Sequence, residues 1–366
     1  MAPEFGQPIE NLPLVPADIL KKHHVHEPMD TRFRSAARLL QALWREDRDL
    51  PIGSYVGDDG KRHKLGSRIT DVAGKIGANF LTPEIAHVAR REIAYREVGA
   101  MVDQDRLATN LLSSMPLTFN LLAPLGMVED RATSVLTELL PAFSGVPMQL
   151  LYEHSPGRGN PRFSADYTAF DAMFRYSTFF GGKGFVAIEI KYSESMREPV
   201  PKMRPRYDEL SESSGLFLDH ADEALRTNPL QQSWRLHMLA QSMIDAGIYN
   251  EGFFVTIAPR LNTQVQQGVE AYERHLREPQ DGKVRFVNLT LEDVIEAIRL
   301  SDKRHADALH RRYCDFWLVD GEMELHAPKA EKEPELAPSA TNVEVNAPDI
   351  STSAEEPRPR KAKKAK

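Results

Sequence analysis

Two neighbouring segments, residues 167–174 and 185–192, are apolar enough to predict β-strands. The chain between them contains Gly181, Gly182 and Gly184, which favours a tight connection, so the two strands are expected to form a β-hairpin. Successive strand residues point to opposite faces of a sheet. The second strand therefore has one apolar face and one face with charged residues. The apolar face consists of Val186, Ile188, Ile190 and Tyr192, and the other face consists of Ala187, Glu189 and Lys191.

The predicted hairpin brings two acidic residues together. If the chain reverses at Phe180, Asp171 lies directly across from Glu189, and directly opposed residues have Cβ atoms about 5 Å apart. Like charges opposed on a sheet are destabilising, so this pair calls for a cation. Mg²⁺ fits, because it binds one or two carboxylates together with water and substrate phosphate. Lys191 could then orient or activate an attacking water, or stabilise charge on the phosphate. The pattern predicts cleavage of a phosphodiester bond.

An Asp on one strand followed by Glu-x-Lys on the next resembles the active-site signature of the PD-(D/E)XK nuclease superfamily, which has the restriction-endonuclease-like fold. Here the signature consists of Asp171 and Glu189-Ile190-Lys191, with Phe170 in place of the proline of the pattern. The resemblance implies an α/β fold with an αβββαβ core and a mixed central sheet. It also implies Mg²⁺-dependent hydrolysis of nucleic acid, with Mn²⁺ as a substitute. Asp171 and Glu189 would be the metal ligands, and Lys191 the catalytic lysine.

Other segments resemble an uncharacterised bacterial branch of that superfamily, whose members are described as restriction endonucleases. The likeness extends over roughly residues 50–320. The segments that carry it are residues 110–116, 119–121, 153–158 and 191–194.

The resemblance also suggests further site residues. Many members of the superfamily add a metal-binding glutamate from a helix that precedes the first core strand. We expect Glu97 in this role, because it lies just before segment 110–116. A polar helix residue often lies beside the metal, and either Gln232 or Arg235 could serve. The alternatives to Glu97 are Glu92, Glu129 and Glu138.

Asp166 competes with Asp171 for the metal role. Five residues separate the two, so on a regular strand they face opposite ways, and only Asp171 matches the face of Glu189. A β-bulge between them would reverse this choice.

The remaining pattern predicts extra N-terminal helices followed by strands and helices in the order of the core. Pro116 and Pro124 are expected to interrupt regular structure in their part of the chain. The turn Asp58-Asp59-Gly60 predicts another hairpin. The polar stretch 199–212 is expected to be an insertion or flap. The expected strands are 146–152, 252–259 and 284–289, and the expected helices are 30–46, 82–112 with a break near Gly99, 129–140, 228–244, 290–300 and 303–315.

Composition limits the class of protein. The 366 residues are 41% hydrophobic, which is enough for a core, and no apolar run approaches the ~20 residues needed to span a bilayer. A membrane partner is therefore not expected. The single cysteine, Cys314, argues against a disulfide framework, fits a reducing cytoplasm and is expected to be a packed apolar residue.

The net charge of −7 contrasts with the basic surface of most nucleic-acid-binding proteins. Local basic clusters provide positive charge near the hairpin instead. They consist of Arg158, Arg162 and Arg175 before it, and Arg197, Lys202, Arg204 and Arg206 after it.

We expect a single nuclease-like domain over residues 31–327. Residues 1–30 are rich in proline and are expected to form an extended arm in which His23, His24 and His26 are solvated and bind no metal. Residues 328–366 contain almost no large apolar residues and are expected to be disordered. Their basic end, residues 358–366, could tether nucleic acid or only improve solubility.

The leading hypothesis is a Mg²⁺-dependent nuclease acting on DNA. One alternative is a nuclease-like binding or scaffold module without turnover. Another is a hydrolase that uses Asp171 and Glu189 as an acid–base pair on a sugar, but this would leave Lys191 without a role. Many restriction-type enzymes dimerise in order to cut both strands, so a homodimer is also considered.

Overall fold

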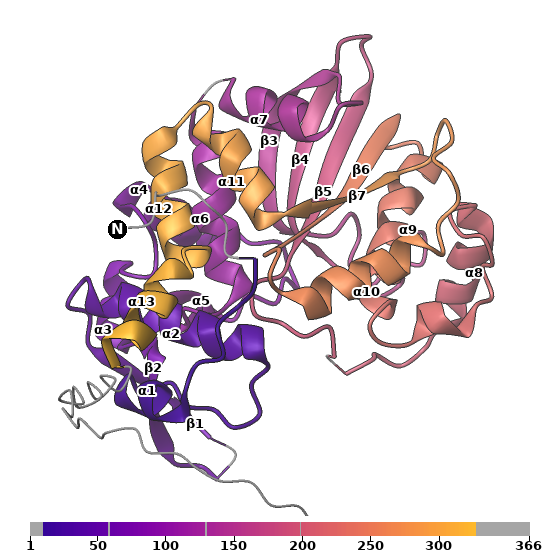
Figure 1. The fold of residues 1–366 in the computed structure, drawn as a ribbon. Coiled ribbons are helices and arrows are strands. Elements are labelled where there is room, and N and C mark those ends of the chain that lie inside the picture. Colours follow the sequence, from indigo (N-terminus) through magenta and orange to yellow (C-terminus); the bar gives the residue numbers. More distant parts are fainter. Residues whose placement is uncertain (1–9, 58, 129, 198, 327–366) are drawn as a thin grey trace, which may run out of the picture. The chain divides into compact units, whose positions relative to one another are not determined.

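A five-stranded mixed β-sheet lies at the centre of the fold in the computed structural model, which describes residues 10–57, 59–128, 130–197 and 199–326 (Figure 1). These residues belong to one compact unit. The predicted disordered tail, residues 328–366, lies outside the described residues. The strands in spatial order are β3 (Gly145–His154), β4 (Phe170–Thr178), β5 (Lys183–Ile190), β6 (Glu251–Ala258) and β7 (Arg285–Thr290).

The connections of the sheet agree with the expected core. β3, β4 and β5 pair antiparallel, whereas β5, β6 and β7 pair parallel. The helix α9 (Gln231–Asp245) lies between β5 and β6 in the chain. A parallel connection needs a crossover of this kind. The chain thus has the predicted order of three strands, a helix and a strand, and the α/β fold class is confirmed.

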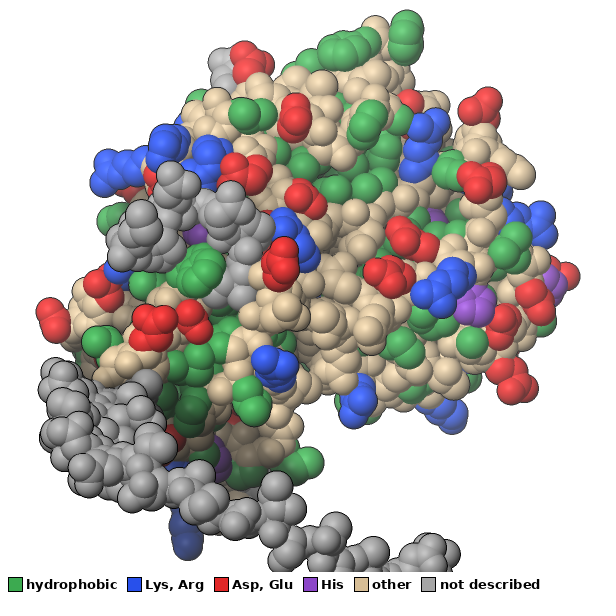
Figure 2. Space-filling view, in the orientation of Figure 1, with side chains coloured by type: hydrophobic (Ala, Val, Ile, Leu, Met, Phe, Trp, Pro, Cys, Tyr) green, Lys and Arg blue, Asp and Glu red, His purple; other side chains and the backbone are tan. Residues whose placement is uncertain are grey.

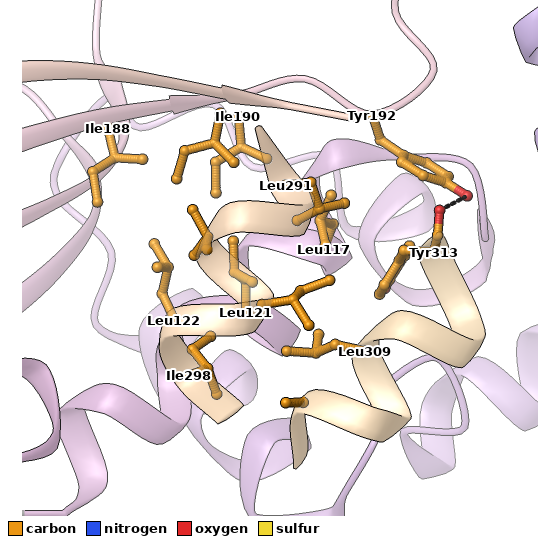
Figure 3. Packing of buried hydrophobic residues seen from close by; sticks show 14 of the residues in the cluster. Leu117, Leu121, Leu122, Ile188, Ile190, Tyr192, Leu291, Ile298, Leu309 and Tyr313 are labelled. Carbon is orange, nitrogen blue, oxygen red and sulfur yellow. Dashed lines mark hydrogen bonds between the residues drawn. The ribbon is translucent and has the colours of Figure 1, made fainter. Parts of the chain in front are cut away.

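Helices cover both faces of this sheet. On one face, α6 (Ser114–Met127), α7 (Arg131–Leu139) and α11 (Leu291–Arg299) pack against the sheet, and on the other face α9 and α10 (Thr263–Glu273) do so. Figure 3 shows Ile188 and Ile190 packed beside leucines of α6 and α11, which confirms the predicted apolar face of β5. Tyr192 belongs to the same core and donates a hydrogen bond to the Tyr313 carbonyl.

The opposite face of β5 is also buried, which the sequence did not predict. Phe185 and Ala187 pack against α9. A strand between antiparallel and parallel neighbours, with helices on both faces, is apolar on both sides. Only the carboxyl end of β5, where Glu189 lies, carries charge into this buried region.

The N-terminal elaboration contains a hairpin and several helices. The predicted helix over 30–46 and the hairpin around Gly60 are confirmed, and Thr82 caps its helix by accepting from the Ile85 N–H at 3.3 Å. Gly99 has a φ of 81° in the predicted break. The elements are α1 (Ala17–Lys22), α2 (Arg32–Glu46), β1 (Ile52–Val56), β2 (Arg62–Ile69), α3 (Asp71–Ile76), α4 (Pro83–Ala94) and α5 (Gln104–Thr109).

The described part of the expected extended arm, residues 10–30, differs from the prediction, because it includes the helix α1. The expectation that His23 is solvated is wrong. Its side chain is buried, with Nδ1 2.9 Å from Glu46 of α2 and Nε2 2.8 Å from Glu322. His24 is exposed, as expected. His23 thus joins the end of α1 to two other helices.

The helix α6 runs through both prolines that were expected to interrupt it. Pro116 lies in the first turn, where a backbone N–H has no intrahelical partner. The N–H that proline lacks is therefore not missed at this position. Pro124 lies in the interior and leaves the carbonyl of Asn120 without its helical donor. The buried side chain of His305 replaces that donor, since its Nε2 lies 2.8 Å from the Asn120 oxygen. Tertiary contacts therefore allow a helix where local rules predict a break.

The C-terminal part of the described chain adds helices around α2. The stretch expected to be a flap contributes much of α8, and the helices α10 and α13 were not predicted. Cys314 packs against the core as expected, and burial raises the pKa of its thiol well above the ordinary value. Within the described ranges, no helix has the length and apolar character to cross a membrane. The remaining elements are α8 (Pro205–Ser214), the 3₁₀ helix η1 (Glu223–Arg226), α12 (Lys303–Tyr313) and α13 (Trp317–His326).

Candidate active site

The hairpin of β4 and β5 forms in the predicted register. Ala172 pairs with Ile188, and Ser177 pairs with Lys183, so the same register places Asp171 opposite Glu189. Gly181 occupies the turn with a φ of 84°, a left-handed conformation that glycine adopts without strain. The two acidic residues therefore lie at the same end of the hairpin, on adjacent strands.

Glu189 and Lys191 form a closed triangle with Gln232 of α9. The Lys191 ammonium lies 2.9 Å from Glu189 Oε1 and donates to Gln232 Oε1 at 2.7 Å. The amide nitrogen of Gln232 in turn donates to Glu189 Oε1 at 2.7 Å. Glu189 is buried. Because Gln232 bonds to both Glu189 and Lys191, α9 holds the two charged groups of the motif in place. Of the two helix residues considered from sequence, Gln232 thus contacts the motif.

Asp171 is joined to the same motif through the backbone. Its Oδ2 accepts a hydrogen bond from the N–H of Ile190, between Glu189 and Lys191, at 2.7 Å. Burial raises the pKa of Asp171 well above its ordinary value, and the negative charge of Glu189 raises it further. Two acids in a buried position thus repel each other, and a cation would relieve this repulsion.

A third acid, Glu153 at the end of β3, lies next to Asp171 and was not predicted. Tyr152 pairs with Ala172 and His154 with Phe170, so Glu153 lies opposite Asp171. Burial and the charge of Glu189 raise the pKa of Glu153 to about 7. The sequence offered no signal for this neighbour, because a long connection (155–169) separates β3 from β4 and leaves their register undefined.

Glu97 lies in the connection after α4, not on a helix as the resemblance suggested. One carboxylate oxygen contacts His154 Nδ1, and the other accepts from the Ser155 N–H at 3.1 Å and lies 3.5 Å from Arg158. Burial raises the pKa of Glu97, but the hydrogen bond to His154 and the other contacts outweigh it and lower the pKa below the ordinary value. Its role as a metal ligand remains a prediction.

Asp166 belongs to a different network. It accepts hydrogen bonds from Ser164, from Thr168 and, at 2.7 Å, from the hydroxyl of Tyr207, and it lies 3.2 Å from Arg235. These contacts satisfy a buried carboxylate without a metal. Arg235, the second helix candidate, is therefore engaged one turn away from Gln232, and the network ties the start of β4 to α8 and α9.

The segments that carry the family resemblance meet around the motif. Glu194 accepts from the Tyr192 N–H at 2.7 Å and from Arg106 at 2.7 Å, and it also accepts from the Ser114 N–H at 3.3 Å. The hydroxyl of Ser193 donates to the Leu112 carbonyl at 3.0 Å. Segment 110–116 is thus fixed directly to the chain that follows Lys191.

The chemistry of these side chains fits a hard divalent ion. Asp171 and Glu189 supply oxygen ligands, and Mg²⁺ completes its shell with water and substrate oxygens. Across the parts of the chain that the structure describes, no three His, Cys, Asp or Glu side chains are already grouped at metal-holding distance. Two carboxylates are enough for Mg²⁺, and their repulsion in a buried position favours its binding.

Comparison with known proteins gives one family. A family model described as the PD-(D/E)XK nuclease superfamily matches residues 28–315, a range that contains the whole sheet and the residues Asp171, Glu189 and Lys191. Searches of curated proteins and of solved structures find no match. Because the model spans most of the chain and the sheet has the order that this family requires, the protein belongs to the PD-(D/E)XK nuclease superfamily.

Proposed function

We propose that this protein is a divalent-metal-dependent nuclease that hydrolyses phosphodiester bonds of DNA, as a restriction-type endonuclease. The observation that carries the proposal is the meeting of Asp171, Glu189 and Lys191 at one end of the hairpin. Lys191 lies 2.9 Å from Glu189, and Asp171 accepts from the N–H of Ile190 between them. A superfamily whose members are nucleases supports the reaction class.

The three side chains have distinct roles in this proposal. Asp171 and Glu189 would hold Mg²⁺ or Mn²⁺, which supplies Lewis-acid polarisation of the phosphate and a bound water of lowered pKa. Lys191 would orient that water or neutralise charge that develops on the phosphate. Gln232 keeps the ammonium and the Glu189 carboxylate in a fixed relation, because it bonds to both.

A basic cluster beside the start of β4 supports DNA as the substrate. Arg206 donates to the Phe163 and Arg162 carbonyls, and Arg204 donates to the Ala165 carbonyl at 2.5 Å. These bonds join two basic clusters that are separate in sequence, while Arg162 and Arg204 stay exposed. Exposed guanidinium groups beside the segment that leads into β4 could bind the phosphate backbone.

Positive charge is local on this protein. On the face shown in Figure 2, Lys and Arg side chains are interspersed with Asp and Glu and form no large basic field. The net charge of −7 agrees with this distribution. We therefore propose that the contacts with DNA are concentrated around the acids and the arginine cluster.

Plasmid cleavage tests the proposal. Purified protein is incubated with supercoiled DNA in Mg²⁺, in Mn²⁺ or in chelator, and nicked and linear products are quantified. We expect metal-dependent cleavage, and a loss of about 100-fold or more in Asp171→Asn, Glu189→Gln and Lys191→Met. Lys183→Met, at the exposed far end of β5, is the matched control and should retain the wild-type rate.

The outcomes separate the alternatives. A folded wild type that cleaves no nucleic acid with any divalent ion excludes the nuclease. If the protein then still binds DNA, a non-catalytic binding module takes its place. Full activity of Glu189→Gln would show that the active site lies elsewhere in the fold.

A further inference from the structure

Three carboxylates lie in a row across three adjacent strands. The register of β3 and β4 places Glu153 opposite Asp171, and the register of β4 and β5 places Asp171 opposite Glu189. Neighbouring strands are about 4.8 Å apart. Asp171 is therefore the middle member, with an acid on each side.

Within the described ranges, the carboxylate of Glu153 has no direct contact with a cation or a hydrogen-bond donor, and only the more distant charges of Arg158 and Arg106 favour its ionised form. Glu97, in contrast, is engaged by His154, Ser155 and Arg158. A half-buried carboxylate without a partner, placed beside two more acids, favours a bound cation. Glu97 already has its cationic and hydrogen-bonding partners.

The backbone at Glu153 is unusual too. Its φ of 47° lies in the left-handed region, which is unfavourable for a residue other than glycine. The guanidinium of Arg158 donates to the Glu153 carbonyl and so stabilises this conformation. Strained backbone of this kind gathers at functional sites.

A small pocket beside these acids contains a second polar group without a partner. The pocket has a volume of about 20 Å³, enough for one water molecule, and Tyr152, Glu153 and Asp171 line it. Glu92 of α4 lines it too, but Arg91 already pairs with that carboxylate at 2.8 Å. The hydroxyl oxygen of Tyr152 exposes less than 1 Å² and makes no hydrogen bond to any described residue. A buried hydroxyl normally has a partner, and a water held in this pocket would supply one.

We propose that Glu153, and not Glu97, is the third carboxylate of the divalent-ion site. This inference rests on the proposed function. Among the described residues no three such side chains are grouped at metal-holding distance, and Mg²⁺ and Mn²⁺ retain several waters in such sites, so Glu153 would act on the ion through a water. The site would then consist of one acid from each of three neighbouring strands, with no glutamate from a helix.

Binding of Mn²⁺ to the full chain, measured by electron paramagnetic resonance without nucleic acid, tests this proposal. The variants are Glu153→Gln, Glu97→Gln and Asp171→Asn, with Glu138→Gln on the exposed side of α7 as the control. We expect Glu153→Gln and Asp171→Asn to weaken Mn²⁺ binding by about 10-fold or more. Glu97→Gln and Glu138→Gln should stay within about twofold of the wild type.

The melting temperatures of the ion-free variants show whether a loss of Mn²⁺ binding comes from misfolding. Removing one of three neighbouring negative charges should leave the melting temperature of Glu153→Gln equal to or above that of the wild type. Wild-type Mn²⁺ affinity in Glu153→Gln would overturn the proposal. An equal loss in Glu97→Gln would do so as well, as would a wild type that binds no Mn²⁺.

Plasmid cleavage by the same preparations distinguishes this proposal from the proposed function. If the wild type binds Mn²⁺ through Glu153 but cuts no DNA, the proposed ion site stands and the proposed nuclease function is wrong. If the wild type cuts DNA and Glu153→Gln binds Mn²⁺ as the wild type does, the nuclease function stands and the role of Glu153 is wrong.

Discussion

The side-chain amide of Gln232 donates a hydrogen bond of 2.7 Å to Glu189 and so joins α9 to the acidic end of β5. The oxygen of the same amide accepts from Lys191. A glutamine suits this position, because it offers a donor to the carboxylate and an acceptor to the ammonium at once. Gln232 is therefore a positioning residue for both groups.

We predict that Gln232→Ala lowers the rate of DNA cleavage by about 10-fold, since Lys191 and Glu189 lose their common partner. The effect should fall on kcat, with KM and the melting temperature little changed. Steady-state kinetics on a labelled duplex measure the two parameters separately. The matched control is Gln267→Ala, an exposed glutamine on α10. An unchanged kcat in Gln232→Ala would mean that the triangle has no role in the reaction.

The arginine cluster predicts a salt-dependent affinity for DNA. Arg204→Ala should weaken binding to all duplex sequences alike and reduce the slope of log K against log salt by about 1, because one phosphate contact is lost. Fluorescence anisotropy with EDTA, at several salt concentrations, measures this slope. Arg274→Ala, at the exposed C-cap of α10, should leave the slope unchanged. Equal slopes in the wild type and Arg204→Ala would place the DNA elsewhere.

His23 predicts a stability that depends on pH. Its hydrogen bond to Glu46 raises the pKa of His23 despite burial, and the bond to Glu322 adds to this rise. Because the folded-state pKa is raised, this contribution is complete below the ordinary value of 6.5 and is lost as pH rises through the folded-state value. Burial raises the pKa values of Glu46 and Glu322, but the bond to His23 lowers the pKa of Glu46, and the bonds to Lys22 and His23 lower the pKa of Glu322. Both pKa values end below the ordinary 4.5, so the contribution of these acids is lost as pH falls below about 4.5.

We therefore expect His23→Asn to be less stable than the wild type by about 1–3 kcal/mol near pH 6, and the difference to shrink as the pH rises above 6.5 and through the raised pKa of His23. Urea unfolding at a series of pH values measures both. His24→Asn, which alters the exposed neighbour, should follow the wild type at every pH. A difference that is constant with pH would show that His23 acts through packing alone.

The contact between His305 and Asn120 predicts a coupling with Pro124. His305→Ala should cost about 1–3 kcal/mol, because it leaves a buried carbonyl without a donor. In a Pro124→Ala background, the new backbone N–H can donate to that carbonyl, so His305→Ala should cost about 1 kcal/mol less. Urea unfolding of the four proteins closes the double-mutant cycle. Strict additivity would indicate that His305 and Pro124 are unrelated.

The sequence predicted the central hairpin because its turn is short. Glycines at 181, 182 and 184 limit where the chain can reverse, and this fixes which residue of β4 faces Glu189. Glu153 could not be placed in the same way, since fifteen residues (155–169) connect β3 to β4 and permit many registers. Gln232 could be named as one of two candidates, but only the packing of α9 on the sheet distinguishes it from Arg235.

Other differences arise where distant contacts outweigh local preference. Pro124 breaks the local rule for a helix, and only His305, distant in sequence, supplies the missing donor. His23 lies in a proline-rich segment that suggests solvent exposure, yet two glutamates from distant helices hold it inside. In both cases the deciding partner is invisible from the neighbouring sequence.

The burial of β5 on both faces has a consequence for how accurate the reactive geometry can be. If this strand slid by one residue against β4 or β6, Ile190 would take the place of Glu189, and charged groups would enter the apolar layer beneath. Such a slip would cost the free energy that the packing of the hydrophobic core provides. The alignment of acid and amine is therefore as stable as the fold itself.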